Sequence, residues 1–139
     1  MADGFALSLQ KGLRAALIAD SNITDIVSTR VYDEPPQNAT FPYLRFNEIS
    51  PTAFDTDTIE GALVGISLEA HSRSPSGRVE AVQIVGALKA ALHRQEGALT
   101  LTGFNLVELI FETFSVTRDG EGRGYTAVIV LQAMLEDNA

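Results

Sequence analysis

The sequence predicts an α+β fold with a mainly antiparallel β-sheet of about four to five strands and two α-helices packed on one face. The predicted elements run helix, three strands, helix, two strands, without the strand–helix alternation of parallel sheets. Residues 62–71 alternate between apolar and mixed side chains, as a strand does when helices cover one face of its sheet. Residues 118–124 hold an Asp-Gly pair and two further glycines, which favour a tight hairpin. The 139 residues, 45% of them apolar, are expected to form a single domain, 1–139, with its own core.

The first helix is predicted over residues 3–19, with Asp3 as its N-cap. One face carries apolar side chains at helical spacing: Phe5, Leu9, Leu13, Ala16 and Leu17. The polar run 20–22 is expected to end this helix, and residues 23–27 suggest one further helical turn.

Three strands are predicted before the second helix. The first, residues 30–33, is short because two prolines follow it, and proline cannot continue a hydrogen-bonded ladder. The second, residues 42–49, begins with a proline, which is tolerated at the first position of a strand. A polar loop over residues 51–61 is then expected to lead into the alternating strand 62–71.

The second helix is predicted to open at Ser74-Pro75 or at Ser76 and to close at Gly97. Its apolar stripe consists of Ala81, Ile84, Val85, Leu88, Ala91 and Leu92. Two long strands, residues 105–117 and 125–135, complete the sheet on either side of the hairpin.

The composition excludes several classes of function. The absence of cysteine rules out disulfides, thiolate catalysis and thiolate zinc sites. With 10 basic and 18 acidic residues the formal net charge is −8, and no two basic residues are adjacent, which disfavours binding to nucleic acid or to an anionic membrane. The sequence has neither an apolar run of about 18 residues nor the pattern of a secretory signal, so the expected compartment is the cytoplasm.

The acidic and histidine side chains do not form a recognisable chemical site. His71 and His93 have no partner at metal-ligand spacing and are interpreted as lone surface histidines without an orienting acid. Three carboxylates in one loop, Asp55, Asp57 and Glu60, could suggest a calcium site. Calcium, however, takes roughly six to eight oxygen ligands, so a solvated acidic loop is favoured.

No catalytic residue, cofactor or metal is therefore predicted. An enzyme would need one carboxylate, Glu69 or Glu108, activated in a pocket. A patterned domain without an active site points instead to work done by surfaces, through self-assembly or partner binding. The apolar strands 105–117 and 125–135 agree with this, although a buried core produces the same pattern.

The chain resembles the tail terminator, or tail-completion, proteins of long-tailed phages, especially the version in gene transfer agents. The resemblance follows the chain in order, and the matching segments are the helix with Leu9, Leu13 and Leu17, residues 30–33, Pro35, residues 41–43, residues 66–72, residues 77–81 and the hairpin at 118–120. One departure is that Ala70-His71 stands where an aromatic residue is common in the family.

This resemblance implies a homo-hexameric ring on the head-proximal end of the tail tube. The ring would stop polymerisation of the tube protein and join the tail to the head–tail connector, or stopper, protein. It would be assembled in the bacterial cytoplasm and become part of the particle at the head–tail junction, without a membrane. DNA would pass through its bore without sequence-specific binding. Six copies at −8 each would carry −48, and an acidic lumen would repel the phosphate backbone.

Two segments are expected to contact the tube protein, the connector or the lumen, because both could reach a neighbour. They are the loop 51–61 and the hairpin 118–124, and their candidate contact residues are Phe54, Asp55, Asp57, Glu60, Arg118, Asp119, Glu121 and Arg123.

Two alternatives remain open at this stage. A head–tail connector or stopper component would share the size and the lack of catalysis, and a requirement for tube capping would separate the two roles. A small non-catalytic ligand-binding module would hold its ligand between the helices and the sheet.

Overall fold

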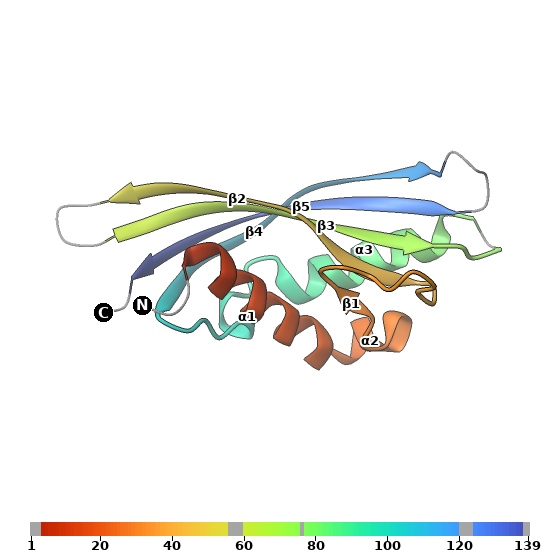
Figure 1. Cartoon of the computed structure of the whole chain (residues 1–139), viewed down its shortest axis with the longest axis horizontal. Helices are drawn as coiled ribbons and strands as arrows, with labels where there is room; N and C mark the ends of the chain where they lie inside the picture. Colours follow the sequence, from red (N-terminus) through yellow and green to blue (C-terminus); the bar gives the residue numbers. More distant parts are fainter. Residues whose placement is uncertain (1–3, 56–59, 76, 120–123, 138–139) are drawn as a thin grey trace.

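The structure is a computed structural model, which describes residues 4–55, 60–75, 77–119 and 124–137. The helices and strands, in chain order, are α1 (Phe5–Ala19), α2 (Ser21–Val27), β1 (Val31–Tyr32), β2 (Tyr43–Asp55), β3 (Glu60–Ser72), α3 (Val79–Leu92), the 3-10 turn η1 (Glu96–Ala98), β4 (Phe104–Arg118) and β5 (Tyr125–Asp137). The strands form one sheet in the order β1-β2-β3-β5-β4 (Figure 1).

The sheet is mainly antiparallel, so the predicted α+β class is confirmed. Only β1 runs parallel to its neighbour β2, through the pairs Val31–Leu44 and Tyr32–Arg45. The three other pairings are antiparallel, and each extends over at least twelve residue pairs.

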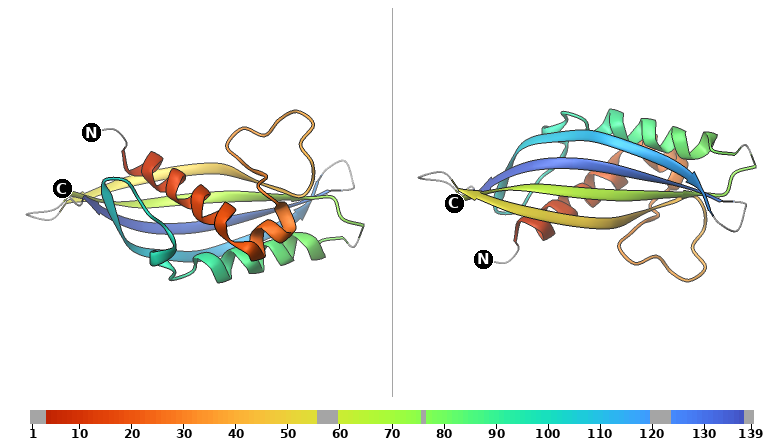
Figure 2. Two further views of the ribbon diagram at one scale, coloured as in Figure 1. Left: turned by 90° about the horizontal axis from the view of Figure 1, so that it is seen from below. Right: turned by 90° about the horizontal axis from the view of Figure 1, so that it is seen from above.

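In Figures 1 and 2 the helices lie on the same side of the sheet, and the other face has none. The side chains of β3 and β5 that face the helices are buried, and they alternate with half-buried ones on the open face. The helices contribute buried leucines, Leu9, Leu13, Leu17, Leu88 and Leu92, to the shared core. This packing buries most of the apolar stripes that the sequence predicts for both long helices, and Phe5, Ala16 and Ala91 are partly buried against the core.

The described residues form a third helix in addition to the two predicted ones. Asp20 ends α1 and at the same time caps α2, because its carboxylate accepts hydrogen bonds from the backbone N–H groups of Asn22 and Ile23. The predicted single turn at 23–27 is therefore a separate helix of seven residues. The predicted cap Asp3 lies outside the described residues, and Gly4 occupies the N-cap position of α1.

The prediction of a loop over 51–61 is wrong at residues 51–55 and 60–61, which belong to strands, and residues 56–59 lie outside the described residues. Strand β2 continues to Asp55 and pairs with β3 along its whole length, with Pro51 opposite Val64. Beyond Arg45, β3 is the only neighbour of β2 among the described residues, and proline is tolerated on such an edge because its missing N–H can face outward. Cross-strand pairing with the strongly patterned β3 overrides the local polarity of this segment.

The predicted ends of the second helix are also wrong. Helix α3 begins at Val79 with Arg78 at the N-cap position, and not at Ser74 or Pro75, whereas Ser76 lies outside the described residues. It ends at Leu92 instead of Gly97, because Arg94 has a positive φ of 57° and donates its backbone N–H to the Leu109 carbonyl of β4. The chain leaves the helix to cover the edge of the sheet.

Candidate assembly surface

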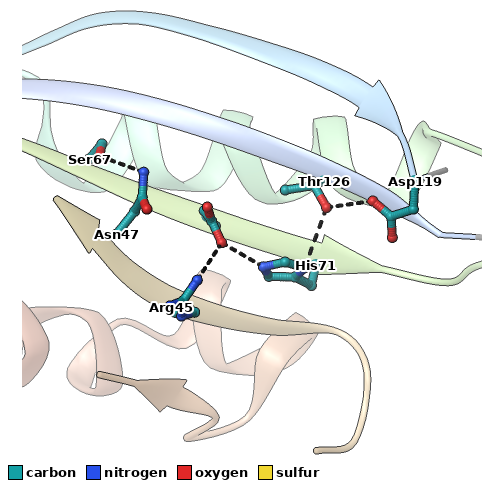
Figure 3. A network of polar contacts seen from close by, with 7 residues as sticks. Arg45, Asn47, Ser67, His71, Asp119 and Thr126 are labelled. Carbon is teal, nitrogen blue, oxygen red and sulfur yellow. Dashed lines mark hydrogen bonds and ion pairs between the residues drawn. The ribbon is translucent and has the colours of Figure 1, made fainter. Parts of the chain in front are cut away.

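One face of the sheet carries no helix (Figures 1 and 2). At one end of this face Glu69 on β3 accepts a bond of 3.1 Å from Arg45 on β2 and lies 2.8 Å from the His71 ring (Figure 3). The carboxylate side chain is only 17% exposed, so both contacts are partly shielded from water. Glu69 therefore ties β2 and β3 together on the open face.

His71 extends these contacts across the sheet. Its ring stacks on Tyr43 with centroids 4.9 Å apart, and its Nδ1 lies 3.4 Å from the Thr126 hydroxyl on β5. That hydroxyl donates a bond of 2.8 Å to Asp119 (Figure 3). The interpretation of His71 as a lone surface histidine is wrong, because strand pairing brings an acid, an aromatic ring and a hydroxyl to it. Burial raises the pKa of Tyr43 above its ordinary value.

The rest of the open face is more apolar. Leu63 and Met134 lie opposite each other on β3 and β5, and Val128 and Val130 follow on β5. These side chains are half-buried, whereas their helix-facing neighbours on β5, such as Ile129, are fully buried. The apolar side chains of the last two strands therefore belong partly to the core and partly to the open face. The interpretation as buried core and the interpretation as exposed surface each account for some of these residues.

The predicted contact residues are split between opposite ends of the molecule (Figure 1). Glu60 is exposed at the start of β3, beside the backbone of Phe54 and Asp55 at the end of β2. Arg118 and Asp119 lie at the other end of the sheet, where β4 ends. The remaining three predicted residues, Asp57, Glu121 and Arg123, lie outside the described residues.

At this second end two arginines gather on one aromatic ring. The Arg118 guanidinium donates a bond of 3.0 Å to the Tyr125 hydroxyl, and the guanidinium carbons of Arg78 and Arg118 lie 5.5 and 5.6 Å from the ring centroid. The bond from Arg118 lowers the pKa of Tyr125 below its ordinary value, because it stabilises the phenolate. Among the described residues, no carboxylate forms an ion pair with either guanidinium.

Part of the outer edge of β4 is covered by the segment that follows α3. The backbone N–H of Leu109 donates to the Glu96 carboxylate at 3.0 Å, and the N–H of Phe111 donates to His93 Nδ1 at 3.0 Å. The bond from Leu109 lowers the pKa of Glu96. His93 thus acts as an edge cap, a role that its sequence position did not reveal because Phe111 is 18 residues away.

Replacement of His93 by alanine should lower the free energy of unfolding by about 0.5–1.5 kcal/mol, because Phe111 loses its acceptor. Urea unfolding followed by circular dichroism measures this change. His93→Asn should restore most of the loss, since its amide oxygen can accept near the position of Nδ1, and Gln95→Ala on the exposed neighbour is the control. An unchanged midpoint in His93→Ala would show that the cap contributes nothing.

The described residues do not form a metal site of three or more His, Cys, Asp or Glu side chains. A surface hollow of about 390 Å³ is lined by Phe41, Tyr43, Arg73 and the loop 36–39, and another of about 210 Å³ lies between α1 and α3. Glu69 and Glu108 line neither of these hollows. None of the described helices is long and apolar enough to cross a membrane.

Comparisons with known proteins agree with a role in assembly. A profile of the family described as Tail completion protein gp17 matches residues 11–136. A chain of the solved structure "Virion of native gene transfer agent (GTA) particle" has the same fold, with a TM-score of 0.84 and 24% identity over 96% of this chain and 99% of that one. No curated protein matches. Because the profile covers almost the whole chain, this protein belongs to the tail completion protein gp17 family and has a structural role in a phage-type tail.

Proposed function

We propose that copies of this chain form a ring that caps the head-proximal end of the tail tube, stops its polymerisation and joins it to the connector under the head. The observation that carries this proposal is the family match over residues 11–136. The chain acts as one domain without catalysis, and it meets the tube protein and the connector protein as its partners. A hexamer is the expected ring.

The two ends of the sheet support a division of contacts. The end with Glu60 and the end with Arg118 point in opposite directions along the strands, so one ring can meet different neighbours above and below. We assign the segments 51–61 and 118–124 to these contacts, with Phe54, Asp55, Asp57 and Glu60 in the first and Arg118, Asp119, Glu121 and Arg123 in the second.

The charge of the chain supports passage of DNA through the ring. At −8 for each copy, the ring as a whole would repel phosphates and would not hold them. The DNA therefore slides without a fixed register, and assembly takes place in the bacterial cytoplasm before the particle leaves the cell.

The direct test is electron microscopy of particles from producing cells that lack this chain. We expect filled heads without tails beside unattached tubes of uncontrolled length, with tailed particles restored by the wild-type chain in trans. Normal tailed particles would contradict the proposal. Tubes of normal length beside heads that have lost their DNA would contradict tube capping and indicate a connector or stopper instead.

A further inference from the structure

Beyond Phe111, the outer edge of β4 has no partner strand among the described residues. In the described part of the chain, β4 is the last strand of the sheet and pairs only with β5. The segment after α3 covers Leu109 and Phe111, so that Thr113–Thr117 forms a free edge.

This free edge lacks the features that normally protect one. Edge strands are usually blunted by charged residues or proline, which prevent another strand from pairing. The five residues Thr113-Phe114-Ser115-Val116-Thr117 contain neither, and their β-branched and aromatic side chains favour a strand. Phe114 is 45% exposed although it lies on the helix-facing side, opposite the buried Ile129. The Thr113–Thr117 edge can therefore pair with another β-strand.

The direction of the unpaired backbone groups can be assigned. Leu109 and Phe111 turn their N–H groups away from β5, and both lie opposite buried, helix-facing residues of β5. In a strand of L-residues the side of the sheet on which a side chain lies determines the direction of its N–H and C=O groups. Phe114 and Val116 lie opposite Ile129 and Ala127, which also face the helices. Their backbone N–H and C=O groups therefore point away from β5 as well.

The opposite edge of the sheet offers a matching strand. On β2, Leu44 donates its N–H to Arg30, away from β3, and its side chain faces the helices. Ile49 and Pro51 lie opposite the buried Ile66 and Val64. By the same rule, their backbone polar groups point away from β3. Beyond Arg45, this part of β2 has β3 as its only described neighbour.

We propose that the Thr113–Thr117 edge of β4 pairs with the Glu48–Thr52 edge of β2 in a second copy of this chain. Strands β2 and β4 run in opposite directions within the sheet, so two copies in the same orientation join their sheets through an antiparallel pair. The contact uses two different surfaces, and a contact of that kind produces a closed ring when its rotation closes. The inference rests on the proposed ring and assigns the subunit contact within it.

One register matches the side chains on both faces. With Ser115 opposite Ser50, Val116 lies opposite Ile49 and Phe114 opposite Pro51, so apolar residues meet on the helix-facing side. The open face then pairs Thr113 with Thr52 and Thr117 with Glu48.

Taken alone, the proposed contact is small. Pro51 has no N–H and so removes one hydrogen bond between the paired strands. Five residues on each side bury less surface than the roughly 1,200–2,000 Å² of a stable interface. We therefore expect a free chain that is mainly monomeric, with closure on the tube, where several weak contacts act together.

The test uses the fact that the chain has no cysteine. Tailed particles carrying Ser50→Cys and Ser115→Cys in the same chain are oxidised with copper phenanthroline and analysed on a non-reducing gel. We expect a ladder of linked chains that ends at the number of copies in the ring. Each single variant should be linked at least tenfold less. The pair Ser50→Cys with Gln95→Cys is the matched control, because Gln95 is exposed on the segment that covers the rest of the β4 edge.

Three results would overturn the contact. The first is a double variant that stays monomeric in tailed particles. The second is a dimer of Ser115→Cys alone, which would show β4 pairing with β4 of another copy. The third is a dimer of Ser50→Cys alone, which would show β2 pairing with β2. Adding Val116→Pro should abolish cross-linking while the free chain keeps its circular dichroism spectrum, since proline is tolerated on an unpaired edge. A ladder from the double variant combined with normal tails in cells lacking the chain would support the contact and contradict the proposed capping function.

Discussion

Replacement of Leu68 by alanine is expected to lower the free energy of unfolding by about 2–5 kcal/mol. Leu68 is fully buried on β3, between Phe46 of β2 and Ile129 of β5, and its side chain faces the helices. Truncation removes apolar contacts and leaves a cavity that the surrounding strands and helices cannot fill without moving.

Urea unfolding of the purified chain measures this loss. The matched control is Leu63→Ala on the same strand, because Leu63 lies half-buried on the open face. That substitution should cost about 1 kcal/mol. Equal losses for the two variants would contradict a core confined to the helix-facing side of the sheet.

Replacement of Gly12 by leucine should be almost as destabilising, by about 2–3 kcal/mol. Gly12 is buried in α1, and a Cβ atom there would collide with the Leu101 side chain and lie 3.0 Å from the Thr100 carbonyl oxygen. The Leu101 side chain could move, but the backbone of Thr100 cannot move without disturbing the segment that leads into β4. The close approach of α1 to this segment therefore requires glycine.

The control for this substitution is Gly86→Leu in α3. Gly86 is exposed, and a Cβ atom there would meet nothing within 4 Å. Leucine has a better helix propensity than glycine by about 0.8 kcal/mol, so this variant should be as stable as the wild type or more stable in the same urea titration. If both leucine variants were stabilising, the packing of α1 against residues 100–101 would have to be looser than described.

The fold class and most elements could be predicted from the sequence because their signals are local. The alternation within 62–71 defines β3, and Asp20 caps a helix through residues only two and three positions away. The errors arise where a distant segment decides the outcome. The end of β2 depends on pairing with β3, and the end of α3 depends on the Leu109 carbonyl.

By itself, the sequence determined the α+β class, the approximate position of each strand, the resemblance to tail-completion proteins and the absence of a recognisable chemical motif. Only the tertiary structure decided that Glu69, His71, Thr126 and Asp119 share one face, that His93 caps β4, and that one edge of the sheet lacks protection. The physical reason is that periodicity and capping act between near neighbours in the chain. Strand register joins residues as far apart as Gly61 and Glu136, and it depends on the packing of the whole sheet.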